Sequence, residues 1–526
     1  MVVSASPYAS RIGAQLLQKG GNAVDAAVGV AFALAVTYPT AGNIGGGGLM
    51  LARINGQTVA LDFREVAPLA ATRDMYLDAK GNPTDRSVTG ALAVGVPGSV
   101  AGLYAAHQKF GVLKWRDVVR PAIALADTGF IADAAFVEDL RDNIPRFSLS
   151  SAAIFTPNGV PVDTGMRWKN PDLAATLKHI AEQGARGFYE GETAEKLVAE
   201  VQRGGGIITR EDLTRYTAKW RTPVEFTYRG HRVLTMPPVS SGGLTFALIA
   251  NILGGYDLRA MGWHSADAMA VMAEAERVAY ARRNTLLADP DFVPTPTDAF
   301  LSPDTAAALR RAIDLRTHVR AQVPPDPVRG RHTTHFSVVD GKGNAVSLTT
   351  TLNTGYGSAV TVTGAGFLLN NEMDDFTAKP GALNQMGLRQ GEANAIAPGK
   401  RMLSSMTPTI VLDSTGATFM VVGAAGGARI ITAVAQIVSN AVDFGMSMRD
   451  AMNAPRFHAQ DYPDRIEMSP GDSVGAAAAV ILRKRGHTVE LAADPWAFGW
   501  AQAIMRSGGR WHGATEPRGH GLAAGY

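Results

Sequence analysis

The sequence of 526 residues contains no cysteine. That absence excludes disulfide scaffolds, thiol nucleophiles, cysteine-ligated zinc sites and iron–sulfur clusters. Long apolar runs are also missing: the longest, residues 26–36, is too short to span a bilayer and is typical of a buried helix. The N-terminus lacks a basic segment followed by an apolar one, so no signal peptide is visible.

An excess of either charge is lacking as well. The 50 Lys and Arg residues nearly balance the 47 Asp and Glu residues, and a net charge of +3 gives no basic surface for nucleic acid. Charged residues are 18% and hydrophobic residues 46% of the chain, so a large core can form and disorder cannot dominate. The length favours either several structural units or one large interleaved unit.

Helices and strands alternate in the first third of the chain. Apolar spacing predicts helices over 9–20 and 23–36, and Asn22 can cap the second of them. A longer helix is predicted to begin after Ser265 and to end near Leu287. Residues 316–332 are rich in Pro, Arg and Gly without periodicity, which predicts an exposed linker.

A β-hairpin is predicted directly after this linker. Strands over 333–339 and 345–352 flank a turn at 340–344. A five-residue loop pairs Val339 with Ala345 and therefore Thr333 with Thr351. Side-chain alternation then places seven mostly polar residues on one face and an apolar set on the other. The polar set is Thr333, His335, Ser337, Ser347, Thr349, Thr351 and Asn353.

Thr333 has two interpretations. Threonine is a good strand residue and needs no further reason to be there. However, a threonine that starts a strand just after an exposed linker is also where an N-terminal nucleophile would lie. If the chain were cut before Thr333, the new α-amino group would be a base beside its own hydroxyl. An amine with a pKa near 8 suits this task at neutral pH.

Short motifs along essentially the whole chain resemble those of one enzyme family, the γ-glutamyltranspeptidases (glutathione hydrolases). The central one is HTTHFSVVD at 332–340. The others are GGGG at 45–48, LDFRE at 61–65, MPPVSSGG at 236–243, LNNEMDDF at 369–376, LSSM at 403–406, GG at 426–427 and the C-terminal segment 516–526.

The resemblance implies an α+β fold of the N-terminal-nucleophile hydrolases, a four-layer αββα sandwich. It implies cleavage between His332 and Thr333, which gives a large subunit 1–332 and a small subunit 333–526 that remain one interleaved catalytic unit. Substrates would be γ-glutamyl compounds such as glutathione, with water, amino acids or peptides as acceptors. No cofactor, metal, nucleic acid or membrane span is implied. Family members are usually exported, so a periplasmic or secreted location is expected, although the visible N-terminus leaves a cytoplasmic one open.

Roles for individual residues also follow from the resemblance. Thr333 would be the nucleophile and Thr351 its hydrogen-bond partner. The remaining residues would bind charged groups of the substrate and the oxyanion. Arg64, Ser404 and Ser405 would hold the α-carboxylate, Asn353, Glu372 and Asp375 the α-ammonium, and Gly426 and Gly427 the oxyanion. Met386 stands in a lid loop where many bacterial members have a tyrosine.

Taken alone, these residues have simpler interpretations. Arg64 lies among acidic neighbours as in a self-neutralising surface cluster, residues 372–375 resemble an ordinary acidic loop, and paired serines or glycines are common in turns. Two other functions are also open: a cephalosporin or glutaryl acylase of the same fold, and a binding protein without turnover. An acylase substrate lacks the α-amino group, so the presence of Asn353, Glu372 and Asp375 favours the γ-glutamyl activity.

Overall fold

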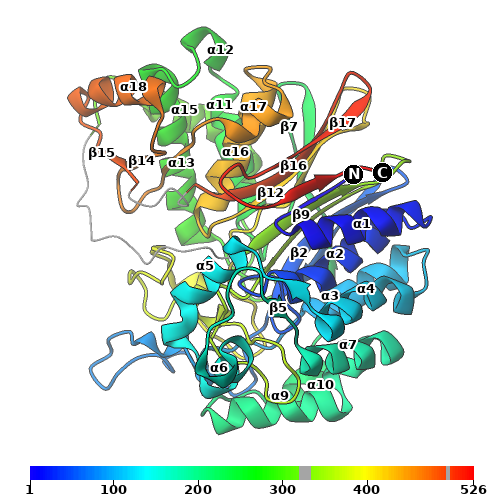
Figure 1. Ribbon diagram of the computed structural model, residues 1–526. Coiled ribbons are helices and arrows are strands. Elements are labelled where there is room, and N and C mark those ends of the chain that lie inside the picture. Colours follow the sequence, from blue (N-terminus) through cyan, green and yellow to red (C-terminus); the bar gives the residue numbers. More distant parts are fainter. Residues whose placement is uncertain (319–332, 493–497) are drawn as a thin grey trace.

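A computed structural model of the protein describes residues 1–318, 333–492 and 498–526. Two β-sheets lie face to face, and helices cover the outer face of each (Figure 1). The predicted α+β class and the four-layer αββα arrangement are therefore confirmed. The described part of the chain contains no helix with the length and apolar character needed to cross a bilayer.

The first sheet has seven antiparallel strands and carries Thr333 and Thr351 at one end. In spatial order they are β18 (Leu522–Ala524), β1 (Val2–Ser4), β9 (Thr334–Val339), β10 (Ala345–Thr351), β2 (Gly47–Ile54), β3 (Gln57–Phe63) and β6 (Lys219–Arg221).

The second sheet has six strands, which are β17 (Arg510–Thr515), β16 (Trp500–Ser507), β12 (Thr418–Ala425), β11 (Thr409–Leu412), β8 (His231–Thr235) and β7 (Val224–Tyr228). Two small sheets lie outside this sandwich. They consist of β13 (Phe457–Ala459), β14 (Ile466–Met468) and β15 (Val489–Leu491), and of β4 (Phe130–Ile131) and β5 (Arg167–Trp168).

Helices α1 (Pro7–Gln18), α2 (Ala23–Thr37) and α3 (Ser99–Phe110) pack on the first sheet. Further helices of this half are α4 (Trp115–Thr128), α5 (Ala134–Asn143), α6 (Leu149–Phe155), α7 (Pro171–Gln183), α8 (Arg186–Tyr189), α9 (Gly191–Arg203) and α10 (Arg210–Arg215).

Helices α11 (Gly242–Leu253), α16 (Arg429–Val442) and α17 (Met448–Asn453) cover the second sheet, and α13 (Ala266–Leu286) packs on α11. The other helices near them are α12 (Leu258–Met261), α14 (Asp298–Leu301), α15 (Pro303–Ala312) and α18 (Ser473–Lys484).

The predicted helix starts are confirmed by their caps. The Asn22 side chain accepts hydrogen bonds from the amides of Val24 and Asp25, and the Asp25 carboxylate accepts one from the Asn22 amide. The Ser265 hydroxyl accepts a hydrogen bond from the Ala268 amide and so caps α13. Each cap satisfies donors that a helix start leaves without an intrahelical partner.

The β9–β10 hairpin has the predicted register, with Ala345 opposite Val339 and Thr350 opposite Thr334. Its apolar face packs against α2. The hydroxyl-bearing face is also buried, because it lies against the second sheet. There the Ser347 hydroxyl donates to the carbonyl oxygen of Val422 (3.1 Å), so backbone groups of the facing sheet satisfy these polar side chains.

Both parts of the chain that flank the predicted cut contribute strands to both sheets. In the first sheet, β9 and β10 lie between β1 and β2, and β18 closes the edge beside β1. In the second, β7 and β8 adjoin β11. The two ends of the chain lie close together (Figure 1). Here β1 pairs with β18, and Val2 lies opposite Ala524.

Most of the predicted linker, including His332, falls outside the described residues. At its described beginning, Arg316 and Thr317 are exposed as predicted, but His318 is not. The side chain of His318 is only 8% exposed and forms ion pairs on both sides of its ring. The chain is therefore anchored at this point rather than running free as an exposed linker, because buried carboxylates supply partners that composition does not reveal.

Candidate active site

A narrow cavity lies at the end of the β9–β10 hairpin. Its volume is about 20 Å³, which is room for about one water molecule. Nine of the ten residues predicted to act in catalysis or substrate binding line it, and Gly426 is the exception. The nine are Arg64, Thr333, Thr351, Asn353, Glu372, Asp375, Ser404, Ser405 and Gly427.

Thr333 and Thr351 form the pair that the hairpin register predicts. Their hydroxyl oxygens are 3.0 Å apart, and both side chains are buried. The Thr351 hydroxyl also accepts a hydrogen bond from the backbone N–H of Asn353 (2.8 Å). Because that oxygen already accepts one hydrogen bond, its own hydrogen is available to Thr333. Thr351 can therefore stabilise negative charge that develops on the Thr333 oxygen.

The backbone at Thr333 is strained. Its φ of 69° lies in the left-handed region, which a β-branched residue adopts only as an outlier. Such a conformation costs about 1–3 kcal/mol and persists only where the surrounding structure imposes it. Strain of this kind at a reactive threonine is consistent with a site where the chain undergoes chemistry.

His335 is close to Thr333 in sequence but is not placed to act as its base. Its ring lies between the two sheets, with Nδ1 at 2.8 Å from the Thr349 hydroxyl and Nε2 at 3.2 Å from the Ser337 hydroxyl. Burial lowers the pKa of His335 to about 3. The imidazole is therefore neutral and structural.

Arg64 is buried rather than part of a surface cluster. Its guanidinium forms ion pairs with the carboxylates of Glu372 and Asp375 and lies 3.9 Å from an oxygen of Glu65. Burial alone would lower the pKa of Arg64, but the three carboxylates raise it, so the group stays charged. Its backbone follows β3, which fixes the side chain at the base of the cavity.

Three carboxylates face this one guanidinium. Glu372 and Asp375 lie on a short 3₁₀ helix, η5 (Glu372–Asp375), and Glu65 follows Arg64 in sequence. Burial raises the pKa of Glu65, Glu372 and Asp375, and Arg64 opposes the rise in each. Both oxygens of Glu65 and one of Glu372 have no hydrogen-bond partner among the described residues. Of these two residues only Glu372 lines the cavity, where its unpartnered oxygen, beside Asp375, is suited to an incoming cation such as an ammonium group.

The loop that carries Ser404 and Ser405 also lines the cavity. The Ser241 hydroxyl and amide both donate to the carbonyl oxygen of Ser404, at 2.6 and 2.8 Å, and the Ser240 hydroxyl donates to that of Met406 at 2.6 Å. The motif at 236–243 therefore supports the serine loop.

Two charged residues at this site were missed from the sequence. Glu65 could have been found, because it belongs to the motif at 61–65. Arg283 gave no signal: it stands in the last turn of α13 beside Arg282, and only the tertiary structure brings its guanidinium to 3.1 Å from the Ser405 hydroxyl.

Gly426 and Gly427 turn the chain from β12 into α16, with φ values of 125° and 59°. Side chains are disfavoured at such angles, so glycine suits both positions. Neither amide of this pair has a hydrogen-bond partner within the described chain. The sulfur of Met386 lies 3.1 Å from where a β-carbon on Gly427 would be, so the lid loop covers the cavity here through an apolar contact.

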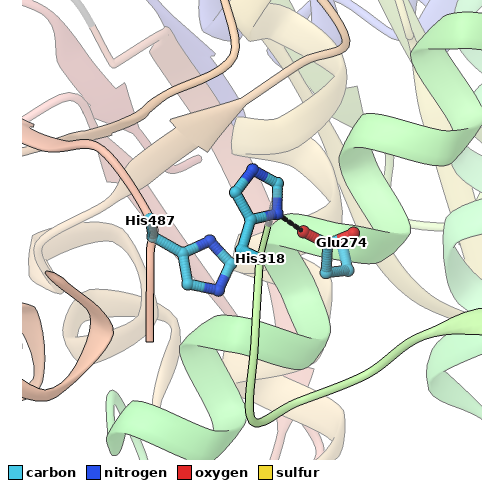
Figure 2. Close-up of side chains that lie close together, drawn as sticks. All are labelled: Glu274, His318 and His487. Carbon is cyan, nitrogen blue, oxygen red and sulfur yellow. Dashed lines mark ion pairs between the residues drawn. The ribbon is translucent and has the colours of Figure 1, made fainter. Parts of the chain in front are cut away.

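A second cluster lies away from this cavity. Figure 2 shows His318 between Glu274, on α13, and His487, and ligand atoms of all three lie within 4.8 Å of one another. The two imidazole rings are stacked, with centroids 4.4 Å apart and an angle of 14°. A metal ion binds in the plane of an imidazole, so two nearly parallel rings cannot both direct a nitrogen lone pair at one ion.

This cluster is instead arranged to hold a proton. The two nitrogens of His318 lie 2.9 Å from a Glu274 oxygen and 3.0 Å from an Asp464 oxygen. Hydrogen bonds to Asp464 and Glu274 raise the pKa of His318 to about 9, whereas burial lowers that of His487 to about 4. A charged His318 therefore joins the segment after α15 to both carboxylates.

We expect this proton to stabilise the fold in a pH-dependent way. Because the pKa of His318 is raised on folding, its contribution is complete below the ordinary value of 6.5 and is lost as the pH rises through about 9. Replacing His318 with glutamine should lower the melting temperature by a few degrees at pH 6. The difference from wild type should shrink above pH 9. A difference that is equal at both pH values would contradict the assignment.

Comparison with known proteins agrees with this site. Residues 9–526 match the family model described as Gamma-glutamyltranspeptidase. The glutathione hydrolase proenzyme of Escherichia coli (strain K12) is 46% identical over 538 residues, which cover 100% of this chain and 92% of that protein.

Solved structures are similar as well. The cephalosporin acylase from Bacillus halodurans superposes with a TM-score of 0.89 at 27% identity, over 100% of this chain and 95% of that one. A chain of the Helicobacter pylori gamma-glutamyltranspeptidase is 42% identical with a TM-score of 0.58, over 59% of this chain and 90% of that one. With the fold, the site and nearly the full sequence in agreement, this chain belongs to the gamma-glutamyltranspeptidase family.

Proposed function

We propose that this protein is a γ-glutamyl hydrolase and transferase that cuts its own chain before Thr333 and then uses Thr333 as the nucleophile. The observation that carries the proposal is one cavity lined by the Thr333–Thr351 hydroxyl pair, a guanidinium, two carboxylates and two serines. This set matches the reacting carbonyl, the α-ammonium and the α-carboxylate of a γ-glutamyl group. Glutathione is the proposed donor, and water, amino acids or peptides are the acceptors.

Processing uses the same hydroxyl as turnover. The Thr333 oxygen attacks the carbonyl carbon of His332, the C–N bond between them breaks, and the Thr333 nitrogen takes up the proton. Water then hydrolyses the resulting ester, which releases the carboxylate of His332 and regenerates the hydroxyl beside a free α-amino group. The strained backbone at Thr333 supports this step, because cleavage removes the constraint on that angle.

The length of a solved relative is in keeping with two subunits. The Helicobacter pylori chain covers only 59% of this chain although 90% of it is matched. A large subunit of residues 1–332 would be a little over three fifths of the chain. Because both parts contribute strands to both sheets, the subunits would remain associated after the cut.

In turnover, the α-amino group of Thr333 takes the proton from its own hydroxyl as the oxygen attacks the γ-glutamyl carbonyl. Thr351 donates a hydrogen bond to the attacking oxygen, and the free amides of Gly426 and Gly427 stabilise the oxyanion. The leaving amine receives the proton, and an ester on Thr333 remains. Water gives hydrolysis of this ester, and an amino acid or peptide amine gives transfer.

The substrate's two charged groups would be held side by side in the cavity, because Arg64 contacts Glu372 and Asp375 directly. Asp375, Glu372 and Asn353 bind the α-ammonium, whereas Arg64, Ser404 and Ser405 bind the α-carboxylate. For Arg64 to reach a carboxylate, its contacts with Glu372 and Asp375 must loosen as the ammonium takes its place beside them. Binding of the two substrate charges is therefore coupled, which favours substrates that carry both.

Cephalosporin or glutaryl acylase activity is the second candidate, supported by the similarity to the Bacillus halodurans acylase. A glutaryl group would bring a carboxylate but no ammonium to a site with three buried carboxylates. The acidic surplus would then be left without a countercharge, which opposes binding.

Release of p-nitroaniline from γ-glutamyl and glutaryl p-nitroanilides separates the two activities. We expect the γ-glutamyl compound to be favoured in kcat/KM by about 10²-fold or more, since its ammonium forms a buried charge pair that the glutaryl compound lacks. Preference for the glutaryl compound would make the protein an acylase. Export is a separate proposal from the family, and cell fractionation of the native host tests it.

A further inference from the structure

Arg283 is a fully buried cation with neutral partners. It lies on α13, and its nitrogens donate to the Ser241 hydroxyl (3.0 Å), the side-chain oxygens of Asn284 (2.8 Å) and Gln390 (3.1 Å), and the Ser405 hydroxyl (3.1 Å). Within the described chain, no carboxylate forms an ion pair with it. Burial lowers the pKa of Arg283, and the charges of Asp375 and Asp461 oppose this only in part. A buried guanidinium that lacks a direct ion pair is stabilised by an anion that comes close to it.

Arg64 differs from Arg283 in this respect. Glu372 and Asp375 already occupy both of its terminal nitrogens, and Glu65 lies 3.9 Å away. A carboxylate that approaches Arg64 therefore competes with two carboxyl groups that already contact the guanidinium. Arg283, which donates to the Ser405 hydroxyl, lies behind the lining of the cavity and has no direct ion pair within the described chain.

The hydroxyl of Ser405 connects this charge to the cavity. A guanidinium only donates hydrogen bonds, so the Ser405 oxygen is the acceptor in its contact with Arg283. The hydroxyl hydrogen has no acceptor within the described chain, and Ser405 lines the cavity. Ser405 can thus donate to a bound anion, and a donor polarised by a cation makes a stronger hydrogen bond than a neutral one.

Arg283 also fixes the neighbouring serine. Its Nε donates to the Ser241 hydroxyl, which itself donates to the carbonyl oxygen of Ser404 at 2.6 Å. One guanidinium therefore holds Ser405 directly and Ser404 through Ser241. The Ser405 hydroxyl is thus held by Arg283 itself, whereas Arg283 supports only the backbone of Ser404, whose hydroxyl accepts from the Met406 amide at 3.0 Å.

We propose that Arg283 is a positioning residue for substrate recognition, which orients and polarises Ser405 so that this hydroxyl binds the α-carboxylate of the substrate. The inference rests on the proposed γ-glutamyl activity and adds to it a second positive charge, which does not touch the substrate. Arg283 thereby favours any acyl donor with a carboxylate at this position over its neutral counterpart.

The test compares γ-glutamyl p-nitroanilide with its α-carboxamide analogue, which keeps the ammonium but has no carboxylate. Replacing Arg283 with glutamine should reduce the preference for the carboxylate substrate by at least about tenfold, through KM rather than kcat. Arg283→Lys should restore part of it. Arg282→Gln is the matched control: it removes a partly exposed charge one residue away and should leave the preference unchanged.

A Ser405→Ala variant provides an independent test with the same two substrates, because it keeps the buried charge of Arg283 and removes only the hydroxyl. It should lose the same preference, and adding Arg283→Gln to it should have little further effect. If Arg283→Gln does not fold, this variant and Arg283→Lys decide the question. Equal effects on both substrates, or a Ser405→Ala variant with the wild-type preference, would overturn the proposal.

A ligand-binding experiment tests carboxylate recognition independently of the proposed γ-glutamyl activity. Protection of the wild-type protein against thermal unfolding by L-glutamate should exceed that by L-isoglutamine, whose α-carboxyl group is an amide. The difference should disappear in Ser405→Ala. Wild-type protein that does not release p-nitroaniline but shows this difference would contradict the γ-glutamyl activity and still support carboxylate binding by Ser405, the hydroxyl that Arg283 orients. The absence of any difference in wild type would overturn the role itself.

Discussion

A Thr333→Ala variant is expected to remain a single chain of 55.4 kDa, whereas the wild-type protein separates on a denaturing gel into fragments of about 35 and about 20 kDa. The variant lacks the oxygen that attacks in both processing and turnover. Thr351, 3.0 Å away, keeps its hydroxyl but has no α-amino group to gain. Release of p-nitroaniline from γ-glutamyl p-nitroanilide should fall by about 10⁴-fold or more.

Two neighbouring changes make this result specific. Thr333→Ser retains a hydroxyl and should be cut, although more slowly. Thr334→Ala, one residue further along β9 and on the opposite face, should be cut as in the wild type. The appearance of the two fragments in Thr333→Ala would show that another group or a protease cuts the chain.

Asp375→Asn should abolish most of the discrimination between γ-glutamyl and glutaryl substrates. The amide keeps the shape of the carboxylate but removes the charge that would pair with the α-ammonium. Loss of one partner of a buried charge pair costs about 3–5 kcal/mol, so kcat/KM for the γ-glutamyl anilide should fall by about 10²-fold or more. Glutaryl anilide, which has no ammonium, should react at least as fast as with the wild type, because Arg64 is then less neutralised.

Asp374→Asn is the matched control for this substitution. Asp374 belongs to the same 3₁₀ helix but does not line the cavity. Its carboxylate accepts hydrogen bonds from the Ser87 hydroxyl (2.7 Å) and from the backbone N–H of Gln385 (3.0 Å). Its replacement should leave the ratio of kcat/KM for the two anilides unchanged. If the ratio of the two activities is unchanged in Asp375→Asn, Asp375 does not recognise the α-ammonium.

The hairpin and the helix starts could be predicted because local rules determine them. The length of the loop at 340–344 and the alternation of side chains were sufficient to pair Thr333 with Thr351. Asn22 and Ser265 act within three residues of their own positions. The site residues beyond the hairpin were identified by resemblance to family motifs, since nothing local in an acidic loop or a serine pair reveals that they share a cavity.

Features that depend on tertiary packing could not be predicted. The hydroxyl-bearing face of the hairpin is buried because backbone carbonyls of a second sheet accept its hydrogen bonds, and those strands lie about 75 residues or more away in sequence. His318 looked like the start of an exposed linker, but its two carboxylate partners come from α13 and from the segment before β14. Arg283 resembled any arginine of an amphipathic helix.

The pairing of β1 with β18 has a consequence for how the polypeptide could be rearranged. The first and last strands are neighbours, with Val2 opposite Ala524, and β9 lies on the other side of β1. If a short peptide joined the two ends, the backbone would form a ring, and an opening at the bond before Thr333 would leave every strand pair intact. Such a circular permutant would begin with the threonine once the initiator methionine was removed, without any need for self-cleavage. In this fold, the position of the nucleophile in three dimensions is thus separable from its position along the gene.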